Sequence, residues 1–191
     1  MRPFYPFVSK AQGIWASIEI AGCNTRKRLT AETIKGAQAM KTVIFDLDGT
    51  LADIETRRVI SIKENGKMDW DIFFDPKNIS LDTPNRPVIT MARLLKESGH
   101  RIVILSGRSK VTKDATREWL KQFDVPFDVL KMRPTGKDFK FMPDDQLKKL
   151  WLDQLFPNTD DVLCVFDDRD KVVKMWRDNG ISCLQVAEGN F

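Results

Sequence analysis

Five consecutive residues, Asp46-Leu47-Asp48-Gly49-Thr50, carry the clearest chemical signal in the sequence. They follow the apolar segment Val43-Ile44-Phe45, whose composition is typical of a buried strand. Residues two apart in a strand share a face, so Asp46 and Asp48 would lie together at the end of that strand. Two carboxylates held so close repel each other unless a cation lies between them. The pattern predicts a metal-assisted site in which one acid is a nucleophile and the other carries protons.

Further polar groups stand where other predicted strands end or a predicted helix begins. The strand 101–105 is followed by Ser106-Gly107-Arg108, whose hydroxyl, backbone N–H groups and guanidinium suit a phosphate, although the same tripeptide is a common turn. The strand 162–166 is followed by Asp167-Asp168. One aspartate is enough to cap the following helix, so the adjacent pair would also complete an oxygen-rich Mg²⁺ site with Asp46. Asp144 and Lys148 are four residues apart in the predicted helix 143–155, so they can pair, and the lysine either meets a phosphate or faces solvent.

Strand and helix patterns alternate from residue 41 onward. This alternation favours right-handed crossovers and a mostly parallel sheet. About 35 residues after the first strand fit neither pattern, and they predict a small flap in which at least two of Trp70, Phe73 and Phe74 pack onto the sheet. The predicted strands are 42–47, 101–105, 127–130, 162–166 and 181–186, and the predicted helices are 88–98, 112–122, 143–155 and 169–179.

The composition limits the class of protein. With 191 residues, 42% of them hydrophobic and 30% charged, the chain fits one globular domain and contains no apolar run long enough to span a membrane. Its three cysteines have no metal-like spacing and predict buried, reduced thiols in the cytoplasm, while His100 reads as a surface turn residue. The net charge of +4 lies entirely in residues 1–40. We therefore expect residues 1–39 to be a leader that is weakly structured or not native, followed by one domain over residues 40–191.

Together these motifs, in this order, resemble those of the haloacid dehalogenase-like phosphotransferases. Leu105-Ser106-Gly107-Arg108, the segment 144–148 and the segment 166–187 are also similar to the 3′-phosphatase domain of bacteriophage polynucleotide kinase-phosphatase. The resemblance covers residues 41–191 and implies a Rossmann-like three-layer α/β fold with a minimal flap or cap. It implies a Mg²⁺-dependent phosphatase that removes 3′-phosphates from nucleic-acid ends during repair. A phosphatase of small substrates such as nucleoside monophosphates, and a non-catalytic binding partner, are the alternatives.

The resemblance also implies a role for each motif. Asp46 would attack phosphorus and become an aspartyl-phosphate, while Asp48 would protonate the leaving oxygen and then activate water. Mg²⁺ would be held by Asp46, the carbonyl of Asp48, Asp167 and Asp168. Ser106 and Lys148 would hold the phosphoryl oxygens, with Asp144 orienting Lys148. The remaining substrate-binding residues implied are Thr50, Arg57 (or Arg58, if the register slips by one), Gly107, Arg108 and Arg133.

Overall fold

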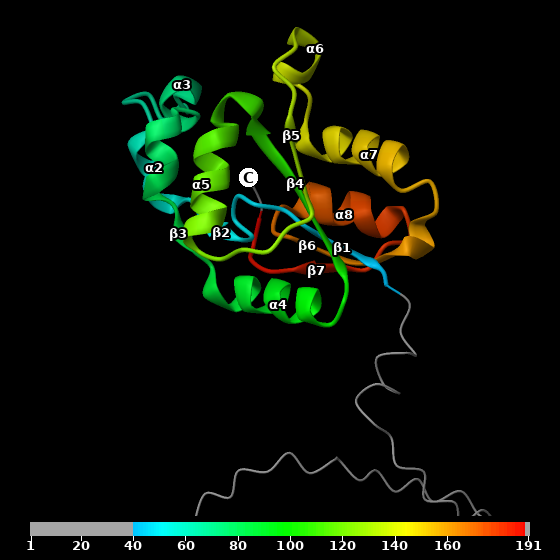
Figure 1. Cartoon of the computed structure of the whole chain (residues 1–191). Helices are drawn as coiled ribbons and strands as arrows, with labels where there is room; N and C mark the ends of the chain where they lie inside the picture. The colour runs from blue at the N-terminus through cyan, green and yellow to red at the C-terminus, as the bar shows by residue number, and fades with distance from the viewer. Residues whose placement is uncertain (1–39, 190–191) are drawn as a thin grey trace, which may run out of the picture. The chain divides into compact units, whose positions relative to one another are not determined.

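A five-stranded sheet forms the centre of the fold (Figure 1). The computed structural model describes residues 40–189, so the expected leader, residues 1–39, lies outside the described part of the chain. The strand order is β5-β4-β1-β6-β7, and every neighbouring pair is parallel. β1 lies in the middle of the sheet, and all four of its residues are buried. The strands are β1 (Thr42–Phe45), β4 (Arg101–Ser109), β5 (Val129–Arg133), β6 (Val162–Asp167) and β7 (Cys183–Gln185).

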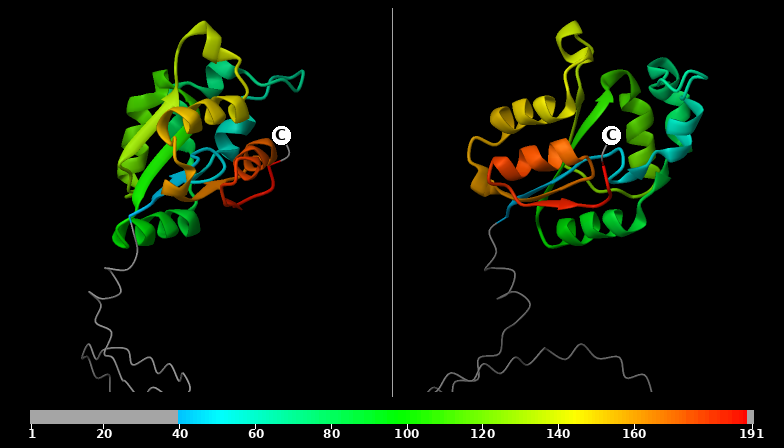
Figure 2. Two further views of the ribbon diagram at one scale, coloured as in Figure 1. Left: turned by 90° about the vertical axis from the view of Figure 1, so that its right-hand side faces the viewer. Right: turned by 180° about the vertical axis from the view of Figure 1, so that it is seen from behind.

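Helices cover both faces of this sheet and complete three layers (Figure 2). Successive side chains of a strand point to opposite faces. Phe45 accordingly packs in one apolar cluster with Trp119 of α5, and Ile44 packs in the other with Trp151 of α7 and Trp176 of α8. The predicted Rossmann-like α/β fold with a central parallel sheet is thereby confirmed. The helices of the core are α4 (Arg86–Glu97), η2 (Lys110–Thr112), α5 (Lys113–Gln122), α6 (Lys137–Lys140), α7 (Asp144–Leu155), η3 (Thr159–Asp161) and α8 (Asp170–Asp178).

The segment between β1 and α4 forms the expected small flap. Phe73 is buried in it, Phe74 is half-buried, and Trp70 is 59% exposed. The three rings contact one another, and none of them belongs to the two apolar clusters on the sheet, so the expectation that at least two pack onto the sheet is wrong. The flap consists of β2 (Ala52–Asp53), α2 (Glu55–Ile60), α3 (Trp70–Phe73), η1 (Pro76–Leu81) and β3 (Thr83–Pro84), with β2 and β3 antiparallel.

Several element boundaries differ from the prediction for local reasons. β4 continues through Ser109, because it pairs with β5 again at Ser109 after an irregularity that begins at Ser106.

His100 is buried at 4% exposure, and its Nδ1 lies 3.4 Å from the backbone N–H of Lys41, so the expectation of a surface turn residue is wrong. Cys164 and Cys183 are free thiols, half-buried and buried respectively. Among residues 40–189, no helix is both long and apolar enough to cross a bilayer.

Candidate active site

Three buried carboxylates meet at the carboxyl ends of β1 and β6. The backbone N–H of Asp46 donates to the carbonyl of Phe166 at 2.9 Å, which fixes the residue after β1 beside the end of β6. Each of Asp46, Asp167 and Asp168 offers an oxygen within 4.8 Å of the other two. Their residues are only 6%, 1% and 3% exposed, so water screens their mutual repulsion poorly. The sequence prediction that these three acids converge agrees with this geometry.

The charge on this triad is poorly compensated. Burial raises the pKa of Asp46 well above its usual value, and the neighbouring charges of Asp167 and Asp168 raise it further against the opposing effect of Lys148. Burial, with the charge of Asp167, also raises the pKa of Asp168 to about 6. Both shifts mean that the ionised triad needs more positive charge than the protein supplies.

The ammonium group of Lys148 hydrogen-bonds to two members of the triad. Lys148 lies on α7, is 3% exposed, and its Nζ donates to Asp46 Oδ1 and to Asp167 Oδ2, each at 2.7 Å. Burial alone would lower the pKa of Lys148, but the charges of Asp167 and Asp46 outweigh burial and raise it. The ammonium group is therefore charged at neutral pH, and the sequence alternative of a solvent-facing lysine is excluded.

The donor set of the triad fits a hard divalent cation. Mg²⁺ prefers carboxylate oxygen ligands, and three such oxygens lie here within reach of one ion. The raised pKa values of Asp46 and Asp168 agree with a site that gains a positive charge when a cation binds. Mg²⁺ held by Asp46, Asp167 and Asp168 would supply charge neutralisation and Lewis-acid polarisation of a phosphoryl oxygen.

Gly49 and Thr50 shape the pocket in which the carboxylate of Asp168 lies. Gly49 has φ +83°, and a Cβ at this position would lie 2.1 Å from Asp168 Oδ2. Only glycine satisfies both constraints, because it accepts a positive φ and leaves this space open. The Thr50 hydroxyl donates to Asp168 Oδ1 at 3.3 Å. The predicted substrate-binding residue Thr50 therefore contacts an acid of the triad.

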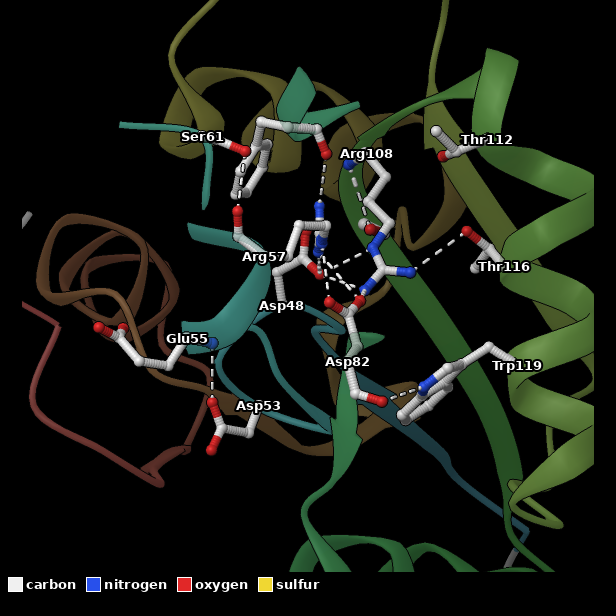
Figure 3. Close-up of polar contacts among 12 residues, drawn as sticks. Asp48, Asp53, Glu55, Arg57, Ser61, Asp82, Arg108, Thr112, Thr116 and Trp119 are labelled. Atoms are coloured by element: carbon white, nitrogen blue, oxygen red, sulfur yellow. Dashed lines mark hydrogen bonds and ion pairs between the residues drawn. The ribbon is translucent and has the colours of Figure 1, made fainter. Parts of the chain in front are cut away.

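The carboxylate of Asp48 belongs to a different group of charges (Figure 3). β1 ends at Phe45, so the prediction that Asp46 and Asp48 share a strand face is wrong. Asp48 Oδ1 accepts from Arg57 Nη2 at 2.8 Å and from Arg108 Nε at 2.7 Å. Burial alone would raise the pKa of Asp48, but the two guanidinium groups outweigh burial and lower it.

Arg57 and Arg108 are completely buried, and their donors contact protein groups. Both guanidinium groups are 0% exposed. Arg57 also donates to the carbonyl of Phe73 at 3.1 Å, and Arg108 donates to the Thr116 hydroxyl at 3.3 Å. Both arginines also contact Asp82, a residue that the sequence does not single out. The sequence predicts Arg57 and Arg108 as substrate contacts, whereas in the structure their partners are these three groups and Asp48.

A third group ties the end of β4 to the start of α7. A Cβ on Gly107 would lie 2.7 Å from Asp144 Oδ1, so the acid is packed directly on this glycine. Arg133 donates to the carbonyl of Gly107 at 3.0 Å and also to Asp144. Asp144 Oδ2 accepts from Arg169 at 2.7 Å. Asp144 and Lys148 form no direct ion pair, because Asp144 contacts these arginines while Lys148 contacts the triad, and the charge of Asp144 acts on Lys148 from a distance.

Ser106 and Arg133 complete the set of predicted residues. Ser106 is fully buried, and its Oγ accepts from the backbone N–H of Arg108 at 3.2 Å. Arg133 donates from Nη1 to the carbonyls of Phe139 at 2.6 Å and Met142 at 2.7 Å, which holds the loop that carries α6. The predicted residues therefore form three contact groups, around Asp168, around Asp48 and around Asp144.

Comparisons with known proteins agree with this arrangement. A family model described as the phosphatase domain of polynucleotide kinase PNKP, of the haloacid dehalogenase (HAD) type, matches residues 40–191. A protein of Autographa californica nuclear polyhedrosis virus named "Putative bifunctional polynucleotide kinase/RNA ligase" is 35% identical over 150 residues, which are 75% of this chain and 19% of that protein.

Solved structures show the same similarity. A chain of the Pnkp1/Rnl/Hen1 complex superposes with a TM-score of 0.64 and 28% identity, over 80% of this chain and 48% of that chain. A haloacid dehalogenase-like family protein from Streptococcus pneumoniae has a TM-score of 0.51 and 17% identity, over 76% of this chain and 84% of that chain, which shows the shared fold. The chain thus spans less than half the length of the polynucleotide kinase relative and of the complex subunit.

Proposed function

The chain belongs to the polynucleotide kinase phosphatase-domain family of haloacid dehalogenase-like phosphatases, and we propose that it is a Mg²⁺-dependent phosphomonoesterase that removes 3′-phosphates from nucleic-acid ends. The observation that carries this proposal is the buried triad of Asp46, Asp167 and Asp168 with Lys148 bonded to two of its members. The relatives with polynucleotide kinase in their names support a nucleic-acid end as the substrate. We propose residues 40–191 as the phosphatase domain.

Asp46 is the proposed nucleophile. A nucleophilic carboxylate must be ionised, and burial opposes ionisation of Asp46. The hydrogen bond from Lys148 at 2.7 Å favours the ionised form, and so would a bound cation. In the proposed reaction Asp46 attacks phosphorus, the bond from phosphorus to the 3′-oxygen breaks, and water then hydrolyses the aspartyl-phosphate. Lys148 would also offset charge that develops on the transferred phosphoryl group.

Asp48 is the proposed proton carrier. Its side chain is 21% exposed, so it is the accessible member of the group it forms with the fully buried Arg57 and Arg108. In the first half-reaction it would give a proton to the departing 3′-oxygen, and in the second it would take a proton from water. Its lowered pKa favours the carboxylate form that the second half-reaction uses. A phosphate dianion bound beside it would favour the protonated form that the first half-reaction uses.

The remaining predicted residues are proposed to shape the substrate site. Ser106 and the backbone of Gly107 would donate to phosphoryl oxygens, and Asp144 with Arg133 would hold this end of β4 in place. We place this activity in the cytoplasm, because the free thiols of Cys164 and Cys183 suit a reducing compartment. The alternative substrates, nucleoside monophosphates, would use the same phosphoryl site.

A substrate comparison tests the proposal. We expect turnover of a 3′-phosphorylated oligonucleotide in MgCl₂ to exceed turnover of 3′- and 5′-mononucleotides and of a 5′-phosphorylated oligonucleotide. EDTA and the Asp46→Asn variant should each abolish it, with the circular dichroism spectrum of the variant unchanged. A preference for mononucleotides would support the alternative, and activity that survives in Asp46→Asn would refute the assigned nucleophile.

A further inference from the structure

Asp82 lies at the centre of a buried four-residue ion cluster (Figure 3). Its carboxylate is 0% exposed, and it accepts from Arg57 Nε at 2.8 Å, Arg57 Nη2 at 3.1 Å and Arg108 Nη2 at 2.5 Å. The same two guanidinium groups bind Asp48. The two positively charged arginines therefore lie between two negatively charged carboxylates, those of Asp48 and Asp82.

Every guanidinium nitrogen of the two arginines contacts a protein partner. Each Nη2 is shared between Asp48 and Asp82, and each Nε is used on one of these two carboxylates. The Nη1 groups donate to the carbonyl of Phe73 and to the Thr116 hydroxyl. Since neither guanidinium has exposed surface, neither can reach a substrate without breaking these bonds. Asp48 is the one member of the cluster that is open to the solvent side.

Asp82 is itself fixed from the core. Trp119 on α5 donates from its indole Nε1 to the backbone carbonyl of Asp82 at 2.9 Å. The backbone N–H of Asp82 donates to the carbonyl of Ile79, at the end of η1. Arg57 is held in turn by the ring of Phe73, whose centroid lies 4.3 Å from the guanidinium carbon. The flap residue Asp82 is thus a rigid acceptor, and the arginines take their orientation from it.

We propose that Asp82 is a positioning residue of the phosphatase reaction, which holds Arg57 and Arg108 in the one arrangement that places the carboxylate of Asp48. The inference rests on the proposed function and on the proton-carrying role of Asp48 within it. Without Asp82, two buried guanidinium groups would share a single carboxylate and would repel each other. Asp48 would then follow the arginines to a new position, and a small misplacement of a proton carrier slows the reaction strongly.

The test uses Asp82→Asn, with Asp75→Asn as the matched control. Asp75 is a half-buried acid of the same flap that caps η1 through the N–H of Lys77 at 2.9 Å, a bond that asparagine can also make. On a 3′-phosphorylated oligonucleotide we expect kcat of Asp82→Asn to fall by about 10- to 100-fold, with KM changed by less than about threefold. The control should match the wild type.

The leaving group separates positioning from general stability. p-Nitrophenyl phosphate serves as the second substrate, because its leaving group, p-nitrophenolate, departs without protonation. A fault in the placement of Asp48 should therefore hardly slow the release of p-nitrophenolate in the first turnover. A loss of first-turnover rate confined to the oligonucleotide supports the proposal, and an equal loss on both substrates, or no loss on either, overturns it. In the Asp48→Asn background, Asp82→Asn should add little, whereas an independent structural role would give the full additional loss.

Two further measurements keep the test decisive. If Asp82→Asn does not fold, Trp119→Phe removes the indole donor to Asp82 together with part of a buried ring, and its activity should show the same pattern with a smaller loss. A crystal structure of either variant should show the Asp48 carboxylate displaced from its place between the arginines, and an unmoved Asp48 overturns the proposal whatever the activity. A wild-type chain without phosphatase activity would instead refute the proposed function.

Discussion

Replacement of Lys148 by methionine tests the electrostatics of the triad most sharply. Methionine keeps an unbranched apolar stem and removes the ammonium group that lies 2.7 Å from both Asp46 and Asp167. Removing one partner of a buried ion pair typically costs about 3–5 kcal/mol, because the other charge stays buried without compensation. We expect Lys148→Met to lose about 3 kcal/mol of unfolding free energy without Mg²⁺. Saturating Mg²⁺ should restore part of this loss, because it compensates the same carboxylates.

The neighbouring residue provides the control. Lys149 pairs with Asp153 on the same helix at 2.5 Å, but both side chains are well exposed. Lys149→Met should therefore lose at most about 0.5 kcal/mol. Urea unfolding followed by tryptophan fluorescence, with MgCl₂ and with EDTA, measures both variants. Phosphatase assays should show a loss of about 10²–10³-fold for Lys148→Met and none for Lys149→Met. Equal stability of the two variants, or a Lys148→Met protein whose stability ignores Mg²⁺, would refute the reasoning.

Two other predictions concern the space beside Gly49 and the ionisation of the Cys183 thiol. Gly49→Ala should lower Mg²⁺-dependent activity far more than Gly66→Ala does, because both glycines have a positive φ but only at Gly49 would a Cβ meet Asp168, 2.1 Å from its Oδ2. Similar activities of the two variants would show that the collision is relieved elsewhere. Burial raises the pKa of Cys183 to about 12, so its thiolate fraction falls as pH drops below that value and at pH 8 is about 1 in 10⁴. Alkylation by iodoacetamide, followed on the Cys183 peptide by mass spectrometry, should be at least about 10²-fold slower in the folded chain than in urea, and comparable rates would contradict that burial.

The sequence was informative wherever a function-bearing residue follows an apolar strand. Asp46 comes directly after β1, and the pair Asp167-Asp168 stands at the end of β6, so the parallel sheet brings the three acids together once its strand order is known. Lys148 could be placed only through the family resemblance, since its partners lie 102 and 19 residues away. The strand order and these long-range contacts depend on tertiary packing.

Local rules failed where distant partners compete for a side chain. The spacing of Asp144 and Lys148 permits a pair, but Arg133 and Arg169 contact Asp144, and Lys148 reaches into the triad instead. Asp82 gave no signal at all, because the turn Asp82-Thr83-Pro84 has an ordinary loop composition. Its guanidinium partners come from α2 and from β4, so only the folded flap shows that this carboxylate is buried.

Transfer of phosphate to Asp46 is the central chemical claim. A 3′-phosphorylated oligonucleotide with a radiolabelled phosphate, mixed with the chain in MgCl₂ and quenched in acid within one turnover, measures it directly. We predict label bound covalently to the chain, on the peptide that contains Asp46, and none on the Asp46→Asn variant. Rapid release of phosphate with no labelled chain, or label on a different residue, would contradict the account.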